Sequence, residues 1–243
     1  MLIKSQVKYI QSLSHKKSRD SEEVFIAEGP KLINELLYTP HVQLQQLFAL
    51  KDWMDGQAPE TAKKTIEISE RELERISFLQ TPNQVLGIFR KPQFAADRPV
   101  RNVVSLMLDT IQDPGNLGTI IRCADWFGIQ QVFCSTDCAD AFNPKVVQAS
   151  MGSIARVQVH YQPLEGILQQ YPDVPAYAAV LDGADLRTWQ PLQQGIIVIG
   201  NESRGISEAV LAGCRHRVTI ARRGQAESLH ASVATGITLS YLV

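Results

Sequence analysis

The stretch VVSLMLDTIQDPGNLGTIIRCADWFGI, residues 103–129, decides the fold. It begins with an apolar, β-branched run over 103–111 that predicts a buried strand. Pro114 and Gly115 signal a turn, and Asn116 is a good N-cap for the helix expected next. The apolar residues of that helix recur at helical spacing and form a core-facing stripe: Leu117, Ile120, Ile121, Ala124 and Phe127. A buried strand that turns into an amphipathic helix is the repeating unit of α/β proteins.

The same rhythm continues to the end of the chain. Five further short runs are apolar or β-branched: QQVFCS, RVQVHY, AYAAVL, GIIVIG and HRVTIA. Strands that are apolar on both faces are typical of a parallel sheet covered by helices on each side. In such sheets ligands bind at the carboxyl ends of the strands. The loops that follow Thr110, Gly200 and Ile220 are therefore the candidate site.

An earlier part of the chain follows a different pattern. EEVFIAEGPKLINELLY (22–38) predicts a strand, a turn and a helix, and VQLQQLFAL and QVLGIFR predict two more strands. The periodicity is lost in KPQFAADRPVRN, which carries two prolines. We expect a small mixed α/β domain over 1–92, a linker over 93–102 and a second domain over 103–243.

Composition narrows the function classes. The chain has 243 residues, with 24 Lys and Arg against 25 Asp and Glu, so it is not a polycation that binds nucleic acid by charge alone. No apolar run is long enough to span a bilayer, and the start lacks a signal-peptide core, which together predict a cytoplasmic protein. The four cysteines form no CxxC pair, and no histidines follow at zinc-ligand spacing, so we expect reduced thiols and no metal site.

Two local basic regions could still contact RNA. The first 19 residues carry Lys16, Lys17 and Arg19 with no acidic residue, and Arg222 and Arg223 lie in the loop after Ile220. Both regions could contact one phosphate backbone. The alternative for the first region is a solvated, partly frayed N-terminus.

Each of the three loops carries candidate polar residues. Arg122 projects from the predicted helix toward the strand ends, or alternatively pairs with Asp125 at the surface. The loop after the predicted strand GIIVIG carries Gly200, Asn201, Glu202 and Gly205. This pattern allows a flat ligand to lie close to the backbone. Glu202 could instead be an exposed carboxylate near Arg204. Neither a GxGxxG fingerprint nor a P-loop occurs in the chain.

The third loop leads into an apolar terminal helix that is rich in small residues. Such a helix packs in a core or in a subunit interface. Ser228 could serve only as its N-cap, and His230 only as a polar residue of its first turn.

Taken together, NLGTIIRCADWFG (116–128), VIGNESRGIS (198–207) and ESLHASVATGI (227–237) resemble, in order and spacing, the three signature motifs of the SpoU/TrmH family of RNA ribose 2′-O-methyltransferases, within the SPOUT superfamily. The likeness runs from about residue 103 to the end. The basic start and the phrase FIAEGPKLI are similar to the small substrate-binding domain that many members carry.

The resemblance implies a C-terminal trefoil knot, S-adenosylmethionine as cofactor and a homodimer formed through the C-terminal domain. It implies that Gly200, Ile220 and Leu229 lie against the cofactor. It implies that Asn116, Arg122, Glu202 and Ser228 form the catalytic and RNA-contacting group, with Glu202 and Ser228 also near the cofactor. One position departs from the motif, because His230 stands where the family usually has Asn.

The implied reaction moves a methyl group from a sulfonium to a ribose hydroxyl. Analogy with the family favours ribosomal RNA as the substrate. A guanidinium stays protonated in proteins, so Arg122 is expected to stabilise developing negative charge rather than accept a proton. An imidazole titrates near neutral pH, which makes His230 a candidate base. The alternatives are transfer RNA as substrate, a catalytically weak RNA-binding homologue, and a small-molecule nucleotide enzyme on an unrelated sheet.

Overall fold

The fold is that of a computed structural model, described here for residues 2–40, 42–94 and 100–243. The chain divides into two compact units. The first comprises Met1–Phe94 together with Phe142–Ala155, and the second comprises Ala95–Ala141 together with Arg156–Val243. Half of the predicted linker, residues 95–99, lies outside the described residues.

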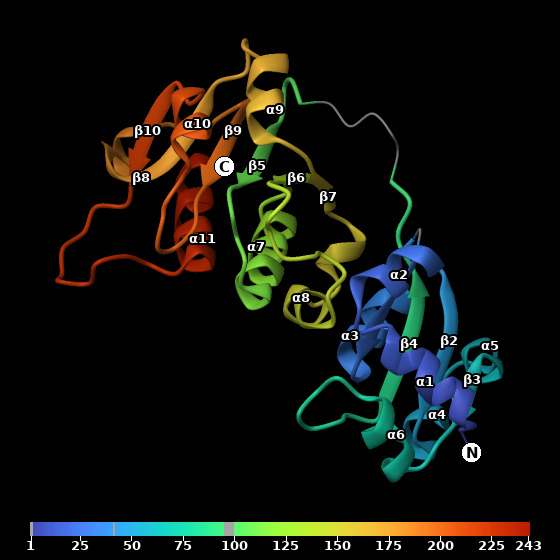
Figure 1. Cartoon of the computed structure of the whole chain (residues 1–243). Coiled ribbons are helices and arrows are strands. Elements are labelled where there is room, and N and C mark those ends of the chain that lie inside the picture. The colour runs from blue at the N-terminus through green and yellow to red at the C-terminus, as the bar shows by residue number, and fades with distance from the viewer. Residues whose placement is uncertain (1, 41, 95–99) are drawn as a thin grey trace. The chain divides into compact units, whose positions relative to one another are not determined.

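The first unit is a mixed four-stranded sheet in the order β1-β4-β2-β3 with helices around it (Figure 1). Strand β4 runs antiparallel to β1 and β2, whereas β2 and β3 are parallel. The predicted strand, turn and helix over 22–38 are confirmed as β1 and α3, and the two further strands as β2 and β4. The elements are α1 (Lys4–Ser12), α2 (Lys16–Glu22), β1 (Val24–Glu28), α3 (Pro30–Leu37), β2 (Leu44–Ala49), α4 (Lys51–Met54), α5 (Pro59–Lys63), β3 (Thr65–Glu67), α6 (Glu70–Ile76) and β4 (Val85–Arg90).

A later segment of the chain also packs in this unit. Helix α8 (Pro144–Ser150) and the 3₁₀ turn η1 (Ser153–Ala155) contribute Val147 and Ala155 to the apolar core that contains Phe25. The ring of Phe142 lies 5.5 Å from that of Phe25. The sequence assigned this segment to the second domain because it lies beyond the linker, and that assignment is corrected here by its packing.

The second unit is built on a six-stranded sheet in the order β10-β8-β9-β5-β6-β7, in which all pairs are parallel. The predicted parallel sheet flanked by helices is confirmed. Its elements are β5 (Val104–Leu108), α7 (Pro114–Trp126), β6 (Gln131–Cys134), β7 (Gln158–Tyr161), α9 (Leu164–Gln170), β8 (Ala176–Asp185), the 3₁₀ turn η2 (Leu186–Thr188), β9 (Gly195–Ile199), α10 (Glu208–Ala212), β10 (His216–Thr219) and α11 (Ala231–Leu242).

Helices cover both faces of this sheet (Figure 1). Helices α9 and α10 pack on Met107 and Val198 of the central strands, mainly through Leu164, Ile167 and Val210. Helices α7 and α11 pack against each other and contact β6 and β9. A β-carbon on Gly236 of α11 would lie 3.7 Å from the Cys123 sulfur of α7, so the two helices approach closely there. This pairing brings the chain end beside the first motif.

Two predicted helix starts are wrong, and the difference matters for the site. Helix α7 begins at Pro114, and its cap is Asp113, whose carboxylate accepts the backbone N–H of Asn116 at 2.8 Å. Asn116 therefore sits inside the first turn, and its side chain is not used for capping. Helix α11 begins at Ala231 with His230 in the cap position, so Ser228 lies outside the helix.

The four cysteines are free thiols, as expected. Within the described residues, no helix is long and apolar enough to cross a bilayer. The described part of the chain also contains no cluster of three or more side chains suited to hold a metal ion.

Candidate active site

The side chain of Asn116 joins three segments that are far apart in sequence. Its Nδ2 donates to Glu202 Oε1 at 2.5 Å, and its Oδ1 accepts from the Ser232 hydroxyl at 2.8 Å. Asn116 comes from the first turn of α7, Glu202 from the loop after β9 and Ser232 from the first turn of α11. The structure thus unites the first and second motifs and the start of α11, and the alternative of Glu202 as an isolated exposed carboxylate is wrong.

The loop after β9 folds into a tight turn. The backbones of Asn201 and Gly205 exchange two hydrogen bonds of 3.0 and 2.9 Å. The Asn201 side chain accepts from the N–H groups of Ser203 and Arg204 and donates to the carbonyl of Thr110 at 2.9 Å. Because its side chain is used inside the loop, Asn201 shapes the site rather than presenting an amide to a ligand.

Gly200 has no room for a side chain. A β-carbon there would lie 2.3 Å from the carbonyl carbon of Gly205 and 2.5 Å from the nitrogen of Ile206, which are both backbone atoms. Gly205 itself has a φ of 70°, the left-handed region that glycine adopts without strain. The two glycines are therefore required by the turn that presents Glu202.

The end of β5 is strained and firmly held. Thr110 has a φ of 60°, which is costly for a β-branched residue. Its N–H donates to the Ser135 hydroxyl at 2.8 Å, and its own hydroxyl donates to Asp109 and Asp137 at 3.1 Å each. The Ser135 hydroxyl also holds the pKa of Asp137 below its usual range. Strain that is held in this way is common at functional sites.

Asp109 connects the end of β5 to the second motif. Its Oδ2 accepts the backbone N–H of Ser207 at 2.7 Å, and its side chain is only 4% exposed. Together with the bond from Asn201 to Thr110, this contact fixes the loop after β9 against the loop after β5. The carboxyl ends of two adjacent strands thereby form one rigid edge.

Arg122 is exposed on α7. The alternative of an Arg122–Asp125 pair is wrong, because Asp125 receives two hydrogen bonds of 2.9 and 2.7 Å from Arg156. Within the described chain, the Arg122 guanidinium has no hydrogen bond or ion pair. Burial raises the pKa of the Cys123 thiol, and the charge of Arg122 opposes that rise. The guanidinium is thus available to a substrate.

The loop after β10 carries the remaining candidates. Every residue from 221 to 230 is exposed, including Ser228, Leu229 and His230, and Ile220 is partly buried at the start of the loop. No backbone hydrogen bond ties the N–H groups of 221–229 to the rest of the described chain. The peptide groups of this loop are therefore available to a ligand.

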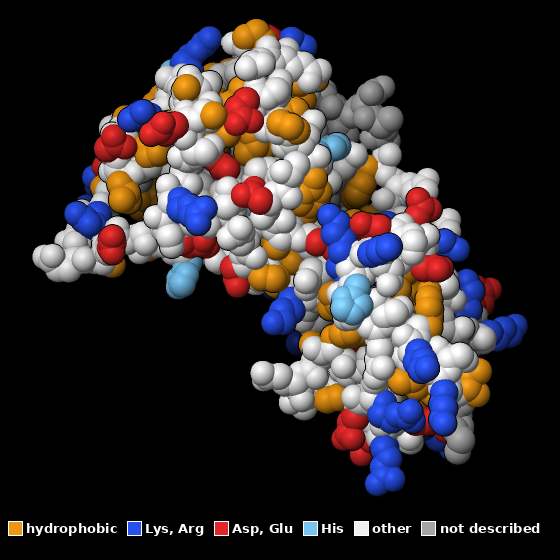
Figure 2. All heavy atoms as spheres, in the orientation of Figure 1, with side chains coloured by type: hydrophobic (Ala, Val, Ile, Leu, Met, Phe, Trp, Pro, Cys, Tyr) orange, Lys and Arg blue, Asp and Glu red, His pale blue; other side chains and the backbone are white. Residues whose placement is uncertain are grey.

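The basic candidates divide into exposed and buried residues. Lys16 and Lys17 are exposed at the start of α2, and Arg222 and Arg223 are exposed in the loop after β10. Arg19 is only 1% exposed, and its Nη1 donates to the carbonyls of Leu13 and Ser14 at 2.7 Å each. The expectation that Arg19 binds RNA is therefore wrong, since its guanidinium closes the end of α1. Figure 2 shows other Lys and Arg side chains spread over the visible face of the first unit.

Sequence reasoning missed Ser232, Asp109 and Thr110. Ser232 is one of several serines near the terminal helix, and only the packing of α11 on α7 selects it as the partner of Asn116. Asp109 and Thr110 end a predicted strand, and the sequence gives no sign that Thr110 adopts a positive φ. A polar pair at the carboxyl end of a buried strand was the one available signal.

Comparisons with known proteins identify the family of each part of the chain. Residues 103–240 match the model of the SpoU rRNA methylase family, and residues 4–87 match the MRM3-like substrate binding domain. The chain is 29% identical, over 98% of its length and 95% of the relative's, to the 23S rRNA (guanosine(2553)-2′-O)-methyltransferase RlmP of Bacillus subtilis. It is 33% identical, over 63% of its length and 38% of the relative's, to the mitochondrial rRNA methyltransferase 3 of Xenopus laevis.

Two solved structures are similar over nearly the whole chain. A TrmH-family protein from Porphyromonas gingivalis has a TM-score of 0.85 and 38% identity, covering 99% of this chain and 98% of that one. An AdoMet-bound rRNA methyltransferase from Sinorhizobium meliloti has a TM-score of 0.84 and 29% identity, covering 99% of this chain and 95% of that one.

Proposed function

This chain belongs to the SpoU rRNA methylase family, and we propose that its C-terminal unit transfers a methyl group from S-adenosylmethionine to the ribose 2′-hydroxyl of one nucleotide of ribosomal RNA. The observation that carries the proposal is the hydrogen-bonded set of Asn116, Glu202 and Ser232. It lies where the family motifs meet, at the carboxyl ends of β5 and β9. The relative RlmP, which is named as a 23S rRNA 2′-O-methyltransferase, supports ribosomal RNA as the substrate class.

S-adenosylmethionine supplies an activated methyl group on a sulfonium when it is bound. Gly200, Gly205, Ile220 and Leu229 would hold it, mainly through the backbone of the turn after β9 and of the exposed loop after β10. The hydrogen bonds of Asn201 keep that turn rigid before the cofactor arrives. Rigid holding matters because methyl transfer requires the attacking oxygen to lie about 3–3.5 Å from the methyl carbon, in line with the sulfur.

Arg122 would stabilise the ribose oxygen as it loses its proton. A free guanidinium presents several N–H donors, and hydrogen bonds that develop with the charge lower the barrier. Glu202 and Asn116 would orient the neighbouring groups, since each already holds the other in place. Ser228 would contact the cofactor or the ribose from the exposed loop.

His230 would accept the proton of the 2′-hydroxyl. It is exposed in the cap position of α11, two residues before Ser232, which contacts Asn116. We expect His230→Asn to lower the rate of methyl transfer by about a hundredfold, because Asn cannot accept a proton. Single-turnover methyl transfer measures this rate. If the variant keeps the full rate, His230 is not the base.

The exposed lysines of α2 and the arginines of the loop after β10 would contact RNA phosphates. We expect replacement of both Lys16 and Lys17 by Ala to weaken RNA binding. The slope of log affinity against log salt concentration should fall by up to about two charges, because a phosphate contact that is lost no longer releases a counterion. The affinity for S-adenosylmethionine should not change. Lys63 and Lys64 are a matched exposed pair at the end of α5, and their replacement should leave the slope unchanged. An unchanged slope in the Lys16 and Lys17 variant would contradict the assignment.

Two architectural features complete the proposal. We infer that the C-terminal segment forms a trefoil knot, supported by its path: after edge strand β10, the chain returns to pack α11 against α7 and β9. We also infer a homodimer through the C-terminal domain. Large apolar side chains on α7 and α11 support it, with Trp126 86% exposed, Val233 48% and Tyr241 42%.

One experiment separates the substrates. Purified protein is incubated with methyl-labelled S-adenosylmethionine and with ribosomal RNA or transfer RNA from cells that lack this protein. We expect label in ribosomal RNA alone. Label confined to transfer RNA would replace the proposed substrate, and RNA binding without label would make the chain a binding homologue in which His230 has replaced the family's Asn.

A further inference from the structure

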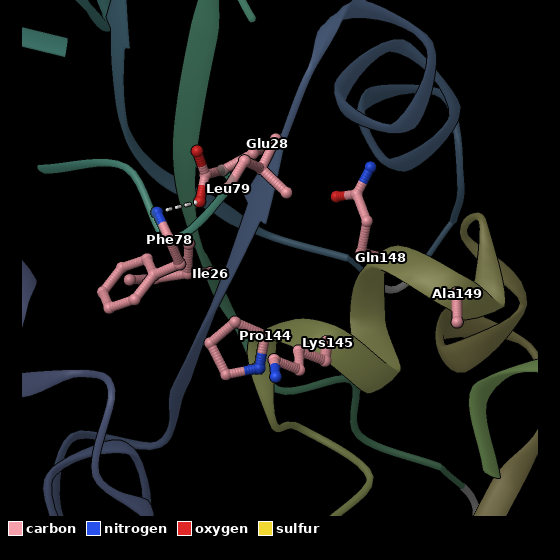
Figure 3. A pocket seen from close by; sticks show the side chains of 8 residues that line it. All are labelled: Ile26, Glu28, Phe78, Leu79, Pro144, Lys145, Gln148 and Ala149. Carbon is pink, nitrogen blue, oxygen red and sulfur yellow. Dashed lines mark hydrogen bonds between the residues drawn. The ribbon is translucent and has the colours of Figure 1, made fainter. Parts of the chain in front are cut away.

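The first unit contains a pocket of about 240 Å³ that none of the residues discussed above lines. It lies between β1, the turn after α6 and helix α8 (Figure 3). Its walls are mostly apolar side chains, which include Ile26, Leu79 and Ala149. Pockets for drug-sized ligands usually measure about 300–1,000 Å³, so this one suits a single small ring system.

A carboxylate forms part of the pocket wall. Glu28 is 3% exposed, and one of its oxygens accepts a hydrogen bond from the Ser77 hydroxyl at 2.5 Å. The other accepts from the Phe78 N–H at 2.8 Å (Figure 3). An ionised carboxylate has about four acceptor sites, so two remain for a ligand. Burial raises the pKa of Glu28. A further N–H donor would offset part of the cost of burying its charge.

Two more polar side chains line the pocket from α8. In Figure 3 the Gln148 amide lies on the opposite side of the pocket from the Glu28 carboxylate. Within the described chain, Gln148 makes no side-chain hydrogen bond, so both its donor and its acceptor are available. Lys145 is exposed, and in that same part of the chain its ammonium has no ion-pair partner. The pocket therefore combines apolar walls, an acceptor, an amide and a cation.

We propose that this pocket binds one unpaired nucleotide of the RNA substrate whose base carries an amino group: guanine, adenine or cytosine. The inference rests on the proposed function, because it assigns the pocket to the same RNA. The apolar walls would contact the faces of the base, Glu28 would accept from its amino group, and Lys145 would contact its phosphate. Gln148 would complete the contact with the base edge.

The Glu28 carboxylate also predicts that the pocket binds uracil more weakly than bases that carry an amino group. Uracil has no amino group, and its single N3–H donor is flanked by the O2 and O4 oxygens, which would face the carboxylate of Glu28 and weaken the contact. A mismatched base contact costs about 1–3 kcal/mol, so uracil should bind about tenfold or more weakly. Guanine offers two adjacent N–H donors, and it should bind most tightly.

The test uses the full chain with carbon-13 labels on isoleucine methyl groups. Ile26 lies in the pocket, whereas Ile167 is buried in the second unit and serves as the internal reference. GMP, AMP, CMP and UMP are titrated separately. We expect a saturable shift of the Ile26 signal with the first three, and one about tenfold weaker with UMP. No saturable shift at Ile26, or equal affinity for UMP, would overturn the proposal.

Variants separate the individual contacts. Gln148→Ala should weaken all the nucleotides, and Lys145→Ala should weaken nucleotides but not nucleosides. Glu28→Gln should remove the preference over UMP, because an amide both donates and accepts. If that variant does not fold, the other two still test the pocket. Gln169 is exposed in α9 of the second unit, and Gln169→Ala should have no effect.

The reaction gives an independent readout. Gln148→Ala should raise KM for ribosomal RNA several-fold while kcat and the affinity for S-adenosylmethionine stay unchanged. If the wild-type protein methylates RNA but no mononucleotide shifts Ile26, the pocket proposal falls and the proposed function stands. If mononucleotides bind selectively but no methyl is transferred, the proposed function falls and the pocket stands.

Discussion

Arg122→Ala lowers the rate of methyl transfer by about a hundredfold to a thousandfold, which is the usual cost of removing one donor to a developing oxyanion. The guanidinium is exposed on α7 and, among the described residues, is not committed to a carboxylate. Its removal therefore costs little folding energy and should leave the affinity for S-adenosylmethionine nearly unchanged. Single-turnover methyl transfer and calorimetry measure the two quantities separately.

The matched variants distinguish charge from geometry. Arg122→Lys keeps the charge but loses the planar array of donors, so it should recover only part of the rate. Arg101 is an exposed arginine paired with Asp173 at 2.7 Å, and Arg101→Ala should leave the rate unchanged. An Arg122→Ala enzyme that retains more than about half of the wild-type rate would remove Arg122 from the mechanism.

Gly200→Ala should abolish cofactor binding and destabilise the second unit. The added β-carbon would lie 2.3 Å from the carbonyl carbon of Gly205, and backbone atoms cannot rotate away as a side chain can. The turn must open, which breaks the paired bonds between Asn201 and Gly205. We expect a loss of about 2 kcal/mol or more, which corresponds to a fall in Tm of roughly 4–8 °C.

A control glycine, Gly166, should show the opposite change in stability when it is replaced by alanine. Gly166 is exposed within α9, has an ordinary helical φ and has no atom within 4 Å of an added β-carbon. Gly166→Ala should therefore raise stability by up to about 1 kcal/mol, because alanine favours the helix. Thermal unfolding and calorimetric titration with S-adenosylmethionine compare the two variants. Unchanged cofactor affinity in Gly200→Ala would contradict the role of the turn.

The sheet of the second unit could be predicted because its strands are short apolar runs separated by helical spacing. The run 195–200 has no polar face, so a strand formed by it must be covered by other elements on both faces. Strands of this kind are typical of parallel sheets. The motif loops then fall at the carboxyl ends of these strands. Glu202 and Asn116 were predicted as partners in one site, and their contact depends on that topology.

Three features of the structure differ from what the sequence predicts. In the sequence, Arg19 resembles the other basic residues near the N-terminus. In the structure, its guanidinium is buried because it donates hydrogen bonds to carbonyls at the end of α1. Asn116 is a common N-cap residue, but Asp113 precedes Pro114, and proline favours the first helical position. The packing of α8 in the first unit has no local signal, because apolar residues such as Val147 suit either core.

The location of the transferred methyl group tests the central claim most directly. Ribosomal RNA that has been methylated by the wild-type protein with labelled S-adenosylmethionine is hydrolysed in alkali, which cleaves every linkage that follows a free 2′-hydroxyl. We expect the label to be recovered in one alkali-resistant dinucleotide, and we expect Arg122→Ala to remove it. Label recovered in mononucleotides would place the methyl on a base, and that result would contradict a site built to activate a ribose oxygen.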